Sequence, residues 1–199
     1  MRIDRRHGHA VRAPRETTDG LESPGMTSGD PDPDPDSRAL LVDEETFTLV
    51  VELEVRQAIR LQYYVCLLVL QADTEERRPD VDWMALHGLV AEAIRDHIRN
   101  TDLVSVRSTP PHVRVLLVSP SLENLPDIIG RIMGAVNGRS FDVDGGGAVH
   151  VTLSLGGACF PTTARSRAEL VRQAQSLSAE ARAEAGRSGH RYRVARRTL

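Results

Sequence analysis

The segment LVSVRSTPPHVRVLLVS, residues 103–119, decides the fold because it predicts a β-hairpin in the middle of the chain. Two runs rich in β-branched and apolar residues, 103–107 and 112–119, lie on either side of Pro110-Pro111. Proline cannot donate to the hydrogen-bond ladder of a sheet, so a proline pair favours a break between two strands. The sequence therefore predicts two short antiparallel strands joined at the prolines.

On both sides of this hairpin, apolar periodicity predicts an alternation of helices and strands. Residues 63–70 form a continuous apolar run, which is typical of a central strand buried on both faces. Apolar residues recur at helical spacing over 44–62, 82–100, 122–136 and 166–185, and further short strands are predicted over 140–143, 148–157 and 192–194. The order α, β, α, β, β, α, β, β, α, β predicts an α+β fold with a central, mostly antiparallel sheet and flanking helices.

The composition separates the chain into a tail and one domain. Residues 1–40 are rich in Asp, Pro, Gly, Ser and Arg and poor in clustered apolar side chains, so we expect a disordered tail or linker there and a single domain over 41–199. The net charge of -3 and the lack of an apolar run of about 18 residues predict no nucleic-acid binding, no membrane insertion and a cytoplasmic location. Cys66 and Cys159 lie in apolar runs, which favours small buried side chains over a metal site or a disulfide.

Several strings, in order, resemble the GGDEF domain of diguanylate cyclases. VTLSLGGACFP (151–161) resembles the late strand of that family, and ELVRQAQSLSAEARAEAGRSGHRYRV (169–194) is similar to its closing helix and strand. FTLVVELEVRQAIR and CLLVLQAD look like its first helix and first strand. The resemblance covers residues 42–194 and implies the palm-like fold of nucleotide cyclases.

The positions that the family uses for catalysis are changed. The family binds two divalent cations through an Asp at the end of the first strand and an acid in its signature turn. Here Gln71 stands at the first position, although Asp73 remains, and Ser108-Thr109-Pro110-Pro111-His112 replaces the signature turn. A neutral amide and a proline cannot serve as hard anionic ligands. The resemblance therefore implies a degenerate domain without catalytic residues, metal site or cofactor.

Three smaller features near the former catalytic turn can be interpreted from the sequence. Asp82 resembles the family's guanine-binding acid, at a shifted spacing, and Arg182 falls near a phosphate-contacting Lys of the family. For Arg182, a solvated helix face explains the residue equally well. His112 has no other histidine at metal-ligand spacing, so we expect a partly exposed turn histidine.

The resemblance also implies a ligand-binding site. Arg99 and Asp102 match the Arg-x-x-Asp of the family's inhibitory cyclic di-GMP site, and Arg131 matches an arginine on the following helix. A guanidinium can bond O6 and N7 of guanine while a carboxylate accepts from its N–H groups. The spacing is common here, since Arg77–Asp80 and Arg139–Asp142 share it, and a helix cap with a surface ion pair is the alternative interpretation of Arg99 and Asp102.

Two functions from different classes follow. The first is a catalytically inactive receptor or effector for cyclic di-GMP, which passes ligand occupancy to a protein partner and in which the ligand bridges two copies of the chain. The second is a ligand-independent protein-interaction module in bacterial signalling. Direct measurement of cyclic di-GMP binding separates the two.

Overall fold

The computed structural model describes residues 38–74, 81–143, 147–188 and 191–196. Most of the predicted tail, residues 1–37, lies outside the described residues, as do Arg77 and Asp80. The described elements are β1 (Leu40–Leu41), α1 (Glu44–Leu61), β2 (Val65–Thr74), α2 (Trp83–Arg95), β3 (Leu103–Ser108), β4 (Pro111–Val118), the short 3-10 helix η2 (Leu122–Asn124), α3 (Leu125–Val136), β5 (Ser140–Val143), β6 (Gly147–Phe160), α4 (Arg167–Ser188) and β7 (Tyr192–Val194).

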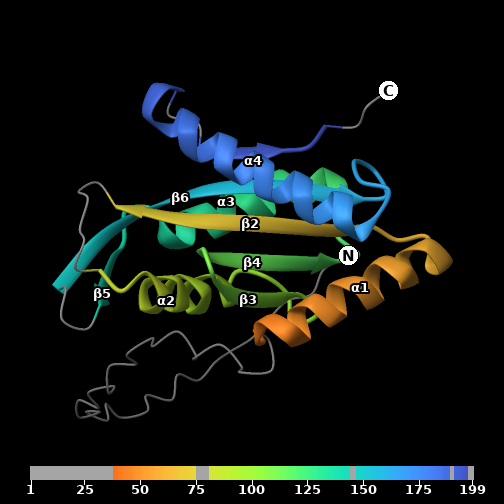
Figure 1. Cartoon of the computed structure of the whole chain (residues 1–199), viewed down its shortest axis with the longest axis horizontal. Coiled ribbons are helices and arrows are strands. Elements are labelled where there is room, and N and C mark those ends of the chain that lie inside the picture. The colour runs from red at the N-terminus through yellow and green to blue at the C-terminus, as the bar shows by residue number, and fades with distance from the viewer. Residues whose placement is uncertain (1–37, 75–80, 144–146, 189–190, 197–199) are drawn as a thin grey trace, which may run out of the picture. The chain divides into compact units, whose positions relative to one another are not determined.

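The strands form one seven-stranded sheet in the order β1-β3-β4-β2-β6-β5, with β7 pairing to β6 (Figure 1). The two predicted hairpins, β3 with β4 and β5 with β6, are antiparallel, as are the pairs of β2 with β4 and with β6. The short pairs of β1 with β3 and of β6 with β7 are parallel. The predicted α+β fold with a mostly antiparallel sheet is confirmed.

The central strand β2 is buried on both faces because helices cover the sheet on each side. Cys66, Leu68 and Leu70 belong to the core that α2 and α3 cover. Leu67 and Val69 alternate with them and belong to the core beneath α1 and α4. Figure 1 shows α4 crossing the near face of the sheet, with α3 behind it. The continuous apolar run of the sequence is the consequence of this arrangement.

Helix α4 approaches the sheet closely because β6 has a glycine where the two meet. A Cβ at Gly156 would lie 2.0 Å from the backbone nitrogen of Ser178 and 2.3 Å from the carbonyl oxygen of Ala174. Only glycine leaves room for this contact of backbone with backbone. Ser178 and Ala174 are both fully buried against β6.

Acidic residues fix the starts of α1 and α2. The side chain of Asp43 accepts from the backbone nitrogen of Thr46 at 2.7 Å. Asp82 Oδ1 accepts from the backbone nitrogens of Met84 at 2.9 Å and Ala85 at 3.1 Å. Such bonds satisfy the free N–H groups of a helix start. In this structure Asp82, which the sequence compares with a guanine-binding acid, is a helix cap.

The domain begins earlier than predicted. Ala39 is fully buried, its nitrogen donates to the carbonyl oxygen of Arg95 at 3.3 Å, and its carbonyl oxygen accepts from Arg95 Nε at 2.8 Å. Arg38 Nε lies 2.9 Å from Asp96 Oδ1. Residues 38–40, which the sequence assigns to the tail, are therefore part of the folded domain. None of the described helices combines the length and apolar character needed to span a membrane.

The prediction that the two cysteines form no disulfide was wrong. Cys66 of β2 and Cys159 of β6 are buried as expected, but they face each other in the strand register, with their Cα atoms 4.1 Å apart, and their sulfurs are bonded. The sequence hides this pair because 93 positions separate the two residues. The cytoplasmic location expected from the sequence stays a prediction.

Candidate functional site

The turn between α2 and β3 is built around the carboxylate of Asp102. Asp102 Oδ2 accepts from the backbone nitrogen of Arg99 at 3.1 Å, and Oδ1 accepts from the backbone nitrogen of Val118 at 2.9 Å. The side chain is buried, with 4% of the residue exposed. Burial raises the pKa of Asp102 above its ordinary value, against the lowering effect of the two backbone bonds and of Arg99. Asp102 therefore holds the turn and ties it to β4.

The two predicted arginines lie at the surface on neighbouring elements. Helix α2 ends at Arg95, earlier than predicted, so Arg99 stands in the turn that follows, where it is exposed. Arg131 is exposed on α3, between the buried Ile129 and Ile132, and α3 packs against α2. Arg131 makes no hydrogen bond or ion pair to any residue that the structure describes. Arg99 and Arg131 are thus available to solvent, whereas Asp102 is not.

Gln71 and Asp73 of β2 meet Arg182 of α4 at the end of β2. Asp73 Oδ1 lies 2.6 Å from Arg182 Nη2, and Asp73 Oδ2 accepts from Ser154 Oγ at 3.2 Å. Arg182 Nη1 also donates to Gln71 Oε1 at 3.4 Å. Helix α4 thereby brings a guanidinium to the position where the resemblance to the GGDEF family implies a divalent cation. Because an arginine already neutralises the carboxylate and the neighbouring side chain is a neutral amide, these residues do not fit a two-cation site.

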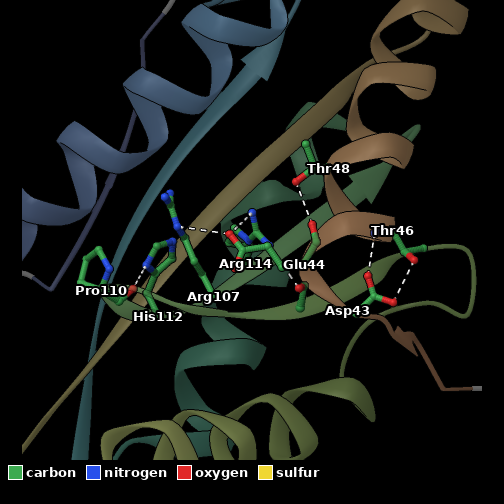
Figure 2. A network of polar contacts seen from close by, with 9 residues as sticks. Asp43, Glu44, Thr46, Thr48, Arg107, Pro110, His112 and Arg114 are labelled. Carbon is green, nitrogen blue, oxygen red and sulfur yellow. Dashed lines mark hydrogen bonds and ion pairs between the residues drawn. The ribbon is translucent and has the colours of Figure 1, made fainter.

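The hairpin between β3 and β4 presents no carboxylate toward this end of the sheet. Its turn runs through Thr109 and Pro110, which are joined by a cis peptide bond, to Pro111 at the start of β4. The next residue, His112, is buried with 3% exposed, and its Nδ1 donates to the carbonyl oxygen of Pro110 over 2.8 Å (Figure 2). The prediction of a partly exposed turn histidine was wrong, because β4 begins at Pro111 and His112 is already a strand residue.

The surroundings of His112 favour its neutral form. Burial lowers the pKa of His112, and the nearby guanidinium of Arg114 lowers it further, against the opposite effect of the bond to Pro110. His112 Nε2 is buried and has no hydrogen-bond partner within the described part of the chain. The buried His87 differs, because its Nε2 accepts from the backbone nitrogen of Ala72 at 3.2 Å and its Nδ1 donates to Trp83 O at 2.6 Å.

Sequence reasoning missed a buried arginine on β4. Arg114 is 9% exposed, its guanidinium carbon lies 4.6 Å from the centre of the Phe47 ring, and Glu44 and Arg107 lie beside it (Figure 2). The signal was present, since Arg114 interrupts the run VRVLL at a position where the neighbouring residues are all buried.

Two cavities in the described part of the chain are lined by residues other than the predicted ligand residues. A cavity of about 940 Å³ lies between α3, α4 and β7, and another of about 210 Å³ lies between α1 and α4. Neither cavity is lined by Arg99, Asp102 or Arg131.

No protein-family model and no curated protein matches this sequence. Solved structures do match it. The GGDEF domain of YfiN (TpbB) from Pseudomonas aeruginosa is 20% identical at a TM-score of 0.64, over 79% of this chain and 98% of that one. The GGDEF domain of FimX from the same organism is 16% identical at a TM-score of 0.64, over 81% and 97%.

Two further matches were solved as complexes. The GGDEF domain of DgcB from Caulobacter crescentus, in complex with c-di-GMP (cyclic di-GMP), is 14% identical at a TM-score of 0.56, over 88% of this chain and 98% of that one. The diguanylate cyclase SiaD from Pseudomonas aeruginosa, in complex with its activator SiaC, is 18% identical at a TM-score of 0.57, over 77% and 58%. With the sheet order and helix layers described above, these matches show that the chain has the fold of the GGDEF domains of diguanylate cyclases.

Proposed function

We propose that this chain is a catalytically inactive GGDEF-fold receptor that binds cyclic di-GMP through Arg99 and Arg131. The observation that carries the proposal is the turn after α2, in which the buried Asp102 fixes the backbone while the guanidinium of Arg99 is left exposed. A guanidinium presented from a fixed backbone can bond O6 and N7 of guanine without rearrangement of the turn. The DgcB domain, with the same fold, was solved with this dinucleotide.

In this proposal Asp102 acts by position and not by contact with the base. Both of its oxygens already accept a backbone N–H, and the residue is buried, so little of the carboxylate is left for guanine. Arg131 supplies the second guanidinium from the exposed face of α3. A dinucleotide has two guanine bases, so one ligand has a second base to offer to an arginine of another copy of the chain.

The absence of catalysis is part of the proposal. Asp73 is neutralised by Arg182, Gln71 is uncharged, and the hairpin offers prolines where an acid ligand would be required. We expect no cyclic di-GMP from GTP with Mg²⁺ or Mn²⁺ when the products are separated by chromatography. Product that disappears in Asp73→Ala would contradict this part of the proposal and leave the binding part standing.

A second candidate function, a ligand-independent protein-interaction module, is favoured by the outer surface of α1. Leu49 is 68% exposed, Leu53 is 49% exposed and Ile59 is 66% exposed. Large apolar side chains gathered on one exposed helix favour contact with another protein. Both candidates allow a protein partner, and they differ in whether Arg99 and Arg131 bind a ligand.

Calorimetric titration separates the two candidates. We expect heat of binding with cyclic di-GMP and a stoichiometry that reports whether the ligand bridges two chains, and weaker or no heat with cyclic di-AMP, whose adenine has an amino group in place of guanine O6. Arg99→Ala and Arg131→Ala should each weaken binding by about 1 to 3 kcal/mol, the usual contribution of a bidentate contact to a base. Arg172→Ala, an exposed arginine on α4, is the matched control. No heat with any nucleotide at high micromolar concentration would favour the interaction module.

A further inference from the structure

A separate polar cavity of about 210 Å³ lies between α1 and α4, on the face of the sheet opposite α2 and α3. Leu67 and Val69 of β2 line its apolar side. Three arginines reach it from three different elements, Arg107 from β3, Arg114 from β4 and Arg167 from α4. None of the residues proposed to bind cyclic di-GMP lines this cavity.

Arg114 is buried in the wall of the cavity without a full set of partners. One of its terminal nitrogens, Nη2, donates to Ser105 Oγ at 3.3 Å, and the guanidinium packs on Phe47. Its Nε is buried and has no partner within the described part of the chain. Burial lowers the pKa of Arg114 from its ordinary value. A buried cation is stable when its donors are paired, and the pairing of Arg114 within the described part of the chain is incomplete.

The charges that line the cavity do not balance. Glu44 is the one carboxylate among the lining residues, and its Oε1 lies 3.3 Å from Arg107 Nε and 4.0 Å from Arg114 Nη1 (Figure 2). Arg167 is exposed and forms no ion pair with the residues that the structure describes. Three guanidinium groups and one carboxylate give the lining a net charge of 3 − 1 = +2. An anion in the cavity would offset this excess.

We propose that this cavity is a binding site for a small tetrahedral oxyanion of the phosphate class. Guanidinium groups from three elements suit an anion with oxygens in several directions better than a planar carboxylate, which presents two. The volume of about 210 Å³ exceeds the share of a single water, about 30 Å³, and is below the roughly 300 Å³ at which pockets for larger ligands begin. A phosphate or pyrophosphate group fits these limits, and a whole dinucleotide does not.

Glu44 must give way when the anion binds. Its side chain is 42% exposed at the start of α1, so the carboxylate can turn toward solvent while Arg107 and Arg114 bond the ligand. The anion can be free phosphate, pyrophosphate or the terminal phosphate of a nucleotide, because these share the recognised group. The site does not depend on cyclic di-GMP, so failure of the receptor proposal leaves it unaffected.

Titration of the full chain with inorganic phosphate and pyrophosphate, in a phosphate-free buffer at ionic strength held constant with NaCl, tests this site. Arg167→Ala removes an exposed guanidinium and should weaken binding about tenfold, the loss of one charge-assisted hydrogen bond. Arg172→Ala removes an exposed arginine of the same helix outside the cavity and should leave affinity unchanged. Glu44→Gln removes the competing carboxylate and should tighten binding.

The three variants are compared after circular dichroism confirms that each is folded. Tighter binding of GTP than of pyrophosphate, lost in Arg167→Ala, identifies a nucleotide as the source, and equal or weaker binding of GTP identifies the free anion. The proposal is overturned when neither phosphate nor pyrophosphate gives saturable heat at low millimolar concentration. It is also overturned when Arg167→Ala and Arg172→Ala have the same affinity, or when Glu44→Gln weakens binding.

Discussion

Replacing Asp102 by alanine separates its structural role from ligand binding. The substitution removes the acceptor of two hydrogen bonds, from the backbone nitrogens of Arg99 and Val118, at a residue that is 4% exposed. A buried donor left without a partner costs about 1 to 3 kcal/mol. Because both donors are only partly buried, we take the lower part of that range for each and expect a loss of about 2 to 4 kcal/mol in the free energy of unfolding.

Urea denaturation without any nucleotide measures this loss, and Arg99→Ala is the matched control. The side chain of Arg99 is exposed and does not accept the backbone hydrogen bonds that hold the turn, so its removal should change the free energy of unfolding by less than about 0.5 kcal/mol. Asp102→Asn keeps one acceptor oxygen and should fall between the two. Equal stability of the Asp102 and Arg99 variants would refute the inference that the carboxylate holds this turn.

Three further predictions test the fold. Gly156→Ala places a Cβ 2.0 Å from the backbone of α4 and should lower the free energy of unfolding by more than about 2 kcal/mol. Gly88→Ala, with open space around it, should leave the free energy of unfolding unchanged or raise it by up to about 1 kcal/mol. Equal effects of the two substitutions in urea denaturation would contradict the close packing. Because the pKa of His112 is lowered in the folded state, its contribution to the free energy of unfolding is present above the unfolded pKa of about 6.5 and is lost as pH falls through the folded pKa. His112→Gln should therefore reduce the loss of stability at acid pH. An unchanged dependence of stability on pH would count against burial of a neutral ring. Deleting residues 1–37 should leave the melting temperature within a few degrees of that of the full chain. A deletion that also removes the buried Ala39 should lower the melting temperature further. Similar melting temperatures for the two deletions would contradict a domain boundary before Ala39.

The main elements of the fold were predictable because their patterns are local. Phe47, Val51 and Val55 recur at helical spacing, and the structure buries all three on α1. The hairpin at Pro110-Pro111 was predicted by two apolar runs on either side of residues that break a strand. Strand β1 was missed, since its two residues carry no periodicity and are held by pairing with β3.

The missing parts of the site depend on contacts between distant segments. An Arg-x-x-Asp spacing is the same for a ligand site and for a turn that caps itself, and the backbone nitrogen of Val118, 16 positions beyond Asp102, helps to hold the carboxylate inward. The ion pair of Asp73 and Arg182 joins residues that lie 109 positions apart in the sequence. Arg114 was detectable as a charge within a buried run, but its partners on α1 were not.

Calorimetric titration of cyclic di-GMP into the full chain and into Arg99→Ala tests directly whether Arg99 binds the ligand. We predict saturable binding to the wild-type chain that is weakened by about 1 to 3 kcal/mol in the variant, while Arg172→Ala binds as the wild type does. Binding of equal strength to the wild type and to Arg99→Ala, or no binding at all, would contradict the assignment of Arg99 to the ligand.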